Sequence, residues 1–159
     1  MSLRWYKIAL TQNLIYSSNR VIKIKIMTHI TLEESKPICE AAITKAQQLG
    51  IKIAVSIVDS AMNLVAMQKM DGALIPSIDG SRGKAVASVI FGQPTGELEE
   101  RSKRTTFRAL EIQWGGRFVM GQGAIPIIRD GEVIGACGVG GGTPEEDEAC
   151  AVSGISILQ

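Results

Sequence analysis

Two cations and a carboxylate are the residues of this sequence whose placement suggests ligand chemistry. Lys84 stands in the apolar stretch GKAVASVI, Arg82 precedes it by two positions, and Asp71 follows a strand-like run. A charge among apolar residues needs a partner, so Lys84 and Arg82 are candidates to bind a carboxylate-bearing ligand. Two plainer interpretations stay open. Lys84 can extend its ammonium past buried methylenes to water, and Asp71 either pairs with Lys84 or only forms a turn.

The usual catalytic constellations are missing from the sequence. It has no Ser/His/Asp set, no cluster of His, Cys and carboxylates at metal-ligand spacing, and no nucleotide-binding fingerprint. Cys137 needs a base to act as a nucleophile, and the one histidine, His29, lies far away in the chain. Acid–base catalysis through Lys84, Asp71 or Glu111 stays open as an alternative, and no residue is assigned a catalytic role.

A glycine-rich segment, GVGGGTPEEDE, raises the question of a phosphate-binding loop. Thr143 and Glu146 match a capping box at the start of a helix, and the acidic residues of that first turn repel a phosphate. The segment also lacks the GxxxxGK[ST] pattern. The glycines at 135, 138 and 140–142 instead indicate a close approach to a strand, by a packed helix, a subunit interface or a flat ligand.

Length and composition are those of one globular domain. The chain has 159 residues, of which 45% are hydrophobic and 21% are charged, and its formal net charge is +1. It has no apolar run long enough to span a bilayer. From Met27 onward, twelve basic residues face sixteen acidic ones. This balance argues against the basic surface of a nucleic-acid-binding domain, so we expect neither nucleic acid nor a membrane as a partner.

The three cysteines indicate a reducing compartment. Cys39, Cys137 and Cys150 are odd in number, lack CxxC spacing and stand in apolar contexts. Free buried thiols are therefore expected in place of a disulfide framework, and the predicted location is the cytoplasm.

Residues 1–26 are expected to lie outside the fold. This segment has a basic start and only short apolar runs, which are too broken for the core of a signal peptide. Part of it, RVIKIKI, alternates like a strand, but Met27 follows and is itself a plausible start. We therefore predict an N-terminal extension at 1–26 and a single domain at 27–159.

Hydrophobic periodicity and turn signals predict the elements that position these residues. In chain order, they are a helix from Leu32 to a cap at Gly50, strands at 51–59 and 63–70, helices at 77–91 and 96–111, strands at 117–120, 123–129 and 132–139, and a helix at 144–158. Short turns between neighbouring strands, such as Asp130-Gly131, predict antiparallel pairing. The predicted fold class is α+β, with an antiparallel sheet of about five strands flanked by helices in the order α-β-β-α-α-β-β-β-α.

The helix predicted at 96–111 carries arginines at helical spacing. Arg101, Arg104 and Arg108 form a stripe, and Glu97 and Glu100 stand four residues before the first two of them. This order favours ion pairs along a helix, so we expect a solvated, salt-bridged face.

Five segments, taken in order, carry a family resemblance: TLEES, AVSIVDSAMNLVAMQKMDGA, SIDGSRGKA, FGQPTGEL and GAIPIIRDGEVIGACGVGGGTPEEDE. From about Thr28 to Leu158, the sequence resembles the GlcG/HbpS-like family of haem-associated proteins, which also occurs as the C-terminal domain of PduO-type corrinoid adenosyltransferases. The resemblance implies an α+β fold, homo-oligomers, and haem or tetrapyrrole binding in some members. Related domains have also been assigned a lyase activity, so the fold does not dictate one function. Here Gly80 and Gly83 interrupt the helical stretch that precedes the GKA motif in the family.

Haem binding requires an apolar slot, axial ligands for the iron and cations for the propionates. The candidate ligand-binding residues are Lys84, Arg82, Asp71, Met70, Thr105, Thr106 and His29. A single histidine excludes ligation of iron by two histidines of one chain. His29, Met70 and a threonine hydroxyl stay open as the axial ligand, with solvent exposure of His29 and core packing of Met70 as the plainer alternatives.

These expectations combine into a small homo-oligomeric protein that binds haem, a corrinoid or a similar flat ligand. We expect it to be accessory to a catabolic pathway for glycolate, a diol or glycerol, or associated with a cobalamin-dependent system. The alternative is a lyase or isomerase that acts on a small oxygenated metabolite through Lys84 and Asp71; a binding protein is preferred to an enzyme. Oligomers are also expected because the strand at 133–139 and the last helix have few polar positions to offer to water.

Overall fold

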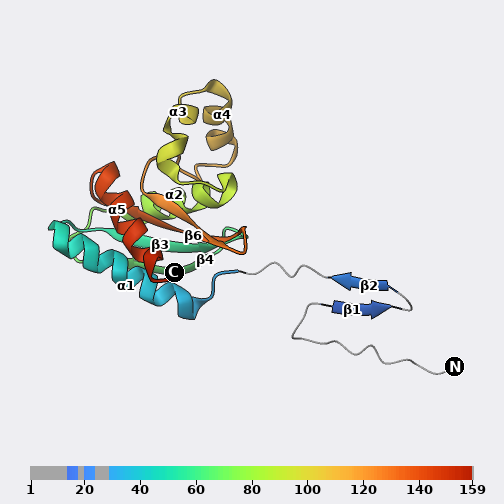
Figure 1. Ribbon diagram of the computed structural model, residues 1–159. Helices are drawn as coiled ribbons and strands as arrows, with labels where there is room; N and C mark the ends of the chain where they lie inside the picture. Colours follow the sequence, from blue (N-terminus) through green and yellow to red (C-terminus); the bar gives the residue numbers. More distant parts are fainter. Residues whose placement is uncertain (1–13, 18–19, 24–28, 159) are drawn as a thin grey trace.

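The computed structural model describes residues 14–17, 20–23 and 29–158 (Figure 1). Its main sheet has four antiparallel strands in the order β4-β3-β6-β5. These strands are β3 (Ala54–Asp59), β4 (Leu64–Lys69), β5 (Ala124–Arg129) and β6 (Glu132–Gly140). The predicted α+β class is confirmed, with four strands in this sheet where about five were expected.

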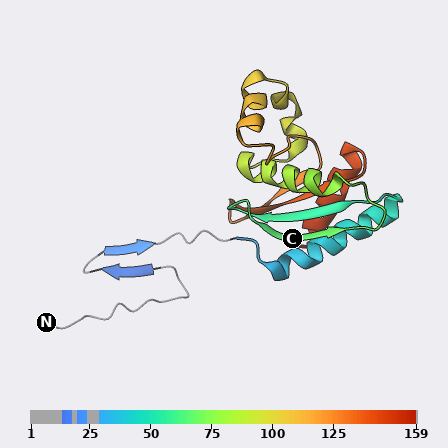
Figure 2. The same ribbon diagram turned by 180° about the vertical axis from the view of Figure 1, so that it is seen from behind.

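Helices cover both faces of the sheet (Figures 1 and 2). One face carries α1 (Leu32–Leu49) and α5 (Pro144–Ile155), and the other carries α2 (Ser77–Phe91). The 3-10 helix η1 (Thr95–Leu98) follows α2 and contacts the sheet, since the Thr95 hydroxyl accepts the N–H of Ala124 on β5 at 2.9 Å. Beyond α2, on the side away from the sheet, stand α3 (Glu99–Ser102) and α4 (Thr105–Gln113) (Figure 2). A last 3-10 helix, η2 (Ser156–Leu158), follows α5.

Local caps set the helix boundaries where the sequence predicts them. The Thr31 hydroxyl accepts the Glu34 N–H, and the Glu34 carboxylate accepts the Thr31 N–H, which completes a capping box at the start of α1. Gly50 ends that helix in the left-handed conformation with φ 71°. A second capping box, formed by Thr143 and Glu146, begins α5.

The glycine-rich strand β6 is in contact with α2. A Cβ atom placed on Gly138 would lie 2.2 Å from the carbonyl oxygen of Ser81 and 2.7 Å from the nitrogen of Ala85. The hydroxyls of Ser56 on β3 and Ser81 on α2 lie 2.8 Å apart. Close approach is therefore confirmed, and at Gly138 the approaching group is a packed helix. Because β6 is an inner strand with both faces covered, it is not the exposed apolar surface from which oligomers were predicted.

The predicted strand at 117–120 is wrong. Val119 donates its N–H to the carbonyl oxygen of Gly83 at 3.0 Å, so this segment packs on α2 and joins no sheet. Phe118 and Met120 are buried, whereas Arg117 and Val119 are exposed. This alternation has the period of a strand, although it arises from a loop that crosses a helix.

The single helix predicted at 96–111 is also wrong, because the segment divides into η1, α3 and α4. The Ser102 hydroxyl bonds to the carbonyl oxygen of Glu99 at 2.7 Å, which competes with continued helix, and Arg104 is extended with ψ 137°. The predicted arginine stripe is consequently split between two helices. Glu100 pairs with Lys103, a partner that the stripe did not predict.

The described part of the N-terminal segment is a hairpin. Its strands, β1 (Leu14–Ser17) and β2 (Arg20–Lys23), pair with each other in a separate two-stranded sheet. The alternating RVIKIKI run thus begins as a strand, and its last residues lie outside the described ranges. Among the described residues, no helix combines the length and the apolar character that crossing a lipid bilayer requires.

A chain truncated to begin at Met27 is expected to unfold at the temperature of the full chain, within about 2 °C. The physical reason is that the strands β1 and β2 pair with each other, while α1 begins at its own capping box. Thermal unfolding of both chains, followed by circular dichroism, measures the difference. A midpoint lower by more than about 4 °C, which corresponds to about 1 kcal/mol in a domain of this size, would place the segment within the fold.

Candidate functional site

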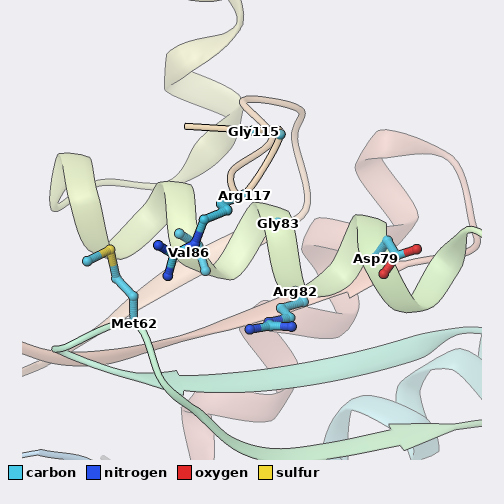
Figure 3. A pocket seen from close by; sticks show the side chains of 8 residues that line it. Met62, Asp79, Arg82, Gly83, Val86, Gly115 and Arg117 are labelled. Atoms are coloured by element: carbon cyan, nitrogen blue, oxygen red, sulfur yellow. The ribbon is translucent and has the colours of Figure 1, made fainter. Parts of the chain in front are cut away.

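A cavity of about 200 Å³ lies between α2, the turn that joins β3 to β4, and the loop after α4 (Figure 3). We call it the cationic pocket; it is lined by Met62, Asp79, Arg82, Gly83, Val86, Gly115, Gly116 and Arg117. Two guanidinium groups and one carboxylate give it a positive formal charge. Across the described residues, no carboxylate lies within ion-pair distance of Arg82 or Arg117. The pocket therefore presents two cations without an ionic partner.

The position of Arg117 follows from glycines around it. A Cβ on Gly83 would lie 2.7 Å from the Val119 side chain, so the absence of a side chain lets the loop pack against α2. Gly115 and Gly116 reverse the chain after α4 with φ values of 63° and 69°. Arg117 then reaches along Val86 toward Met62, while Arg82 extends from α2 toward the sheet (Figure 3). The predicted interruption at Gly83 is thus a packing site within a continuous α2.

Met62 enters the pocket from a strained turn. Its φ of 66° lies in the left-handed region, which costs a residue with a side chain about 1 kcal/mol or more. The Asp59 carboxylate holds this turn by accepting the N–H groups of Ala61 at 2.9 Å and Asn63 at 2.8 Å. His29 approaches the same turn, with its Nδ1 2.6 Å from the Ser60 hydroxyl. One turn therefore contacts the single histidine and presents a thioether to the pocket.

Lys84 has an ionic partner, Asp147, that the sequence analysis missed. Its Nζ donates to Asp147 Oδ2 at 2.7 Å and to the Val139 carbonyl oxygen at 3.1 Å, and the two side chains are 14% and 3% exposed. Asp147 Oδ1 accepts the N–H of Gly142 at 2.9 Å. The pair joins α2 to the glycine turn before α5, and it explains why a cation stands in an apolar stretch. Asp71 does not pair with Lys84. It lies exposed in the turn after β4, which is the second of the two roles predicted for it.

Lys84 and Arg82 line different cavities. A second cavity, of about 240 Å³, is bordered by Leu74, Pro76, Ser77, Gly80, Lys84, Gly140, Gly141, Gly142 and Asp147. Positions two residues apart point to different sides of a helix, so Arg82 reaches the cationic pocket and Lys84 does not. The two cations predicted to meet one ligand are therefore separated by the body of α2.

The other candidate residues lie elsewhere in the domain. Met70 packs against the core beneath α1, and its N–H donates to the carbonyl oxygen of Ile53 at 2.9 Å. Thr105 and Thr106 are exposed at the start of α4. Neither Met70 nor these threonines line the cationic pocket. Met62 and Arg117 do line it, and sequence reasoning missed both.

The cysteines are buried free thiols, as predicted. Burial raises the pKa of Cys39 to about 11 and the pKa of Cys150 to about 11, and it raises the pKa of the fully enclosed Cys137 further. All three are thiols at neutral pH, so Cys137 is not an activated nucleophile. Within the described ranges, no group of three or more His, Cys, Asp or Glu side chains is arranged to hold a metal ion.

Comparison with known proteins gives a family and relatives. Residues 30–156 match the model of a family described as haem degrading protein HbpS-like. A 15.0 kDa protein from the dhaT-dhaS intergenic region of Citrobacter freundii is 34% identical over 130 residues, which cover 81% of this chain and 92% of that protein. The corrinoid adenosyltransferase PduO of Salmonella typhimurium is 29% identical over 130 residues, which span 39% of that enzyme.

Solved structures share the whole α+β domain. The Klebsiella pneumoniae protein ORFY superposes with a TM-score of 0.79 at 29% identity, covering 85% of this chain and 94% of its own. A complex of PduOC with haem superposes with a TM-score of 0.75 at 29% identity, covering 81% of this chain and 94% of PduOC. A double mutant of HbpS from Streptomyces reticuli superposes with a TM-score of 0.77 at 27% identity, covering 91% of this chain and 97% of HbpS. Since the family model spans the domain from the start of α1 to the end of α5, this chain is a member of the HbpS-like family.

Proposed function

We propose that this chain is a small homo-oligomeric protein that binds haem or a similar flat tetrapyrrole. The observation that supports this proposal most is the similarity, at 29% identity and a TM-score of 0.75, to a domain solved in complex with haem. The similarity to part of PduO further supports association with a cobalamin-dependent system, where a corrinoid is the flat ligand. An accessory role in the catabolism of glycolate, a diol or glycerol belongs to the same proposal.

The cationic pocket has groups that suit one edge of haem. Arg82 and Arg117 offer planar donors for propionates, Val86 supplies an apolar wall, and the Met62 thioether is a soft group that can ligate iron. The cavity, at about 200 Å³, is smaller than the roughly 300–1,000 Å³ of pockets that enclose a whole ligand. We therefore propose that it holds the carboxylate edge, while the macrocycle extends over the neighbouring surface. His29 stays a candidate axial ligand because it contacts the turn that carries Met62.

Hemin added to the full chain is expected to give a shifted Soret band that saturates at a fixed stoichiometry. Arg82→Ala and Arg117→Ala each remove a charge-assisted contact to a propionate, so each is expected to weaken binding by about 1.5–3 kcal/mol, which is about tenfold or more. Arg101→Ala is the matched control, because Arg101 is an exposed arginine of α3 outside the pocket. Absence of a spectral shift with stoichiometric hemin and an intact oligomer would remove haem from the proposal.

The axial ligand is tested in the same titration with His29→Ala and Met62→Leu. Loss of the shifted band in only one variant identifies the iron ligand, because the other variant leaves the coordinating atom in place. If both variants keep the spectrum of the unchanged chain, neither residue ligates the iron.

Homo-oligomers are proposed from apolar side chains on the surface. Leu74 and Ile75, in the loop before α2, are 64% and 90% exposed, and Ile112 on α4 is 81% exposed. Adjacent large apolar side chains at this exposure are typical of a surface that another subunit covers. Light scattering at micromolar concentration is expected to give a mass of at least twice the 17.0 kDa of one chain. A mass near 17.0 kDa would contradict the proposal.

The lyase or isomerase alternative depended on Lys84 and Asp71, and the ion pair that Lys84 forms is with Asp147. Lys84→Met is expected to lower the free energy of unfolding by about 3–5 kcal/mol, because it leaves the buried Asp147 carboxylate without its cation. Urea unfolding measures this loss. The matched control is Lys36→Met, which removes an exposed pair with Glu33 and is expected to cost less than about 1 kcal/mol. Equal stability of Lys84→Met and the unchanged chain would show that the pair is dispensable and would restore Lys84 as a free functional cation.

A further inference from the structure

An aromatic side chain, Trp114, lies beside the cationic pocket. It directly follows α4, and 37% of its surface is exposed. A separate cavity of about 390 Å³ is lined by Gln113, Trp114 and Arg117. Arg117 lines this cavity and the cationic pocket alike, so the two hollows share one residue. Trp114 and both arginines thus line two neighbouring hollows that meet at Arg117.

The Trp114 ring is held in place before any ligand binds. It meets the ring of Phe118 edge to face, with centroids 5.8 Å apart and an angle of 75° between the planes. Phe118 is buried, so it provides a fixed support. The Arg117 guanidinium lies over the indole ring, 6.0 Å from its centroid, so a flat ligand would stack on the part of the ring that Arg117 leaves exposed. A ring that keeps exposed surface while its rotamer is fixed is suited to stack on a flat ligand at low entropic cost.

The groups that line the cationic pocket and the Trp114 cavity suit a flat ring and its carboxylates better than they suit a metal. The described residues that line them include no His, Cys or Tyr, and the side chains left to ligate iron are the Met62 thioether, which is a weak ligand, and the Asp79 carboxylate. In contrast, two guanidinium groups without carboxylate partners face the pocket, with Asp79 offsetting one positive charge. Recognition therefore falls to stacking and to charge-assisted hydrogen bonds.

We propose that Trp114, Arg82 and Arg117 form a site for a flat macrocycle that carries carboxylates, and that this site accepts the macrocycle with or without a metal at its centre. This inference rests on the proposed binding of haem or a similar tetrapyrrole. It adds the chemical class of the ligand: an acidic porphyrin, recognised by its ring face and its carboxylate edge.

The test compares three probes on one protein. Trp5→Phe in the full chain leaves Trp114 as the single tryptophan. Its fluorescence is followed while hemin, metal-free protoporphyrin IX or protoporphyrin IX dimethyl ester is added at equal concentration of carrier solvent. All three share the ring face, the first two share the carboxylates, and the first alone holds iron. Each probe that stacks on Trp114 is expected to quench its emission.

Hemin and protoporphyrin IX are expected to bind within about threefold of each other, and the dimethyl ester is expected to bind at least about tenfold more weakly, because its esters make no charge-assisted bonds to arginine. Trp114→Ala, titrated through the absorbance of the porphyrin, is expected to weaken hemin and protoporphyrin IX about equally. Ile112→Ala is the matched control, since Ile112 is an exposed apolar residue of α4 that lines neither cavity.

The outcomes separate this inference from the proposed function. Tight binding of hemin with little binding of protoporphyrin IX would overturn the inference and leave haem binding standing, because iron would then be the recognised group. Equal binding of the acid and its dimethyl ester would also overturn it. Binding of protoporphyrin IX without binding of hemin would overturn haem as the ligand, and it would also overturn the inference that the site accepts the macrocycle with a metal at its centre. The probe comparison needs no variant in either cavity, so its result does not depend on how Trp114→Ala folds.

Discussion

The close contact of α2 with the backbone of β6 is the constraint on which two cavities depend: the cationic pocket, which Arg82 lines, and the second cavity, which Lys84 lines. At Gly138 the helix lies nearer to the strand than any side chain would permit, and Ser81 of the helix hydrogen-bonds to Ser56 on the neighbouring strand β3. Since the helix cannot roll without losing this contact, the direction of each residue on it is set. Arg82 is directed to one side and Lys84 to the other, so a single packing contact divides the charged residues of α2 between two cavities.

Elements whose signals are local could be predicted from the sequence. The capping box of Thr31 and Glu34 involves residues three apart, and the turn at Asp130 and Gly131 needs only two residues that tolerate positive φ, observed at 51° and 77°. Such features depend little on the rest of the fold. Where local pattern misled, tertiary packing was the cause: the segment around Val119 alternates because it crosses α2, and it forms no strand.

The candidate site could be predicted only in part, because its residues meet through tertiary structure. Arg82 was a candidate as the cation two positions before Lys84, yet its neighbour in the pocket, Arg117, comes from a loop that the sequence analysis assigned to a strand. Lys84 and Asp147 are 63 positions apart, and nothing in either local sequence identifies the other. The glycines that precede Arg117 were the one available sign, since paired glycines after a helix indicate a reversal of the chain.

Because the three cysteine sulfurs are buried, chemical modification of these thiols can report on the opening of this domain. Cys39, Cys137 and Cys150 belong to α1, β6 and α5, and none of them has accessible surface. An alkylating reagent can reach them only through conformations in which the helical layer has separated from the sheet. The rate of thiol modification therefore measures how often the helices separate from the sheet. A ligand that binds only the closed domain would lower this rate in proportion to its occupancy.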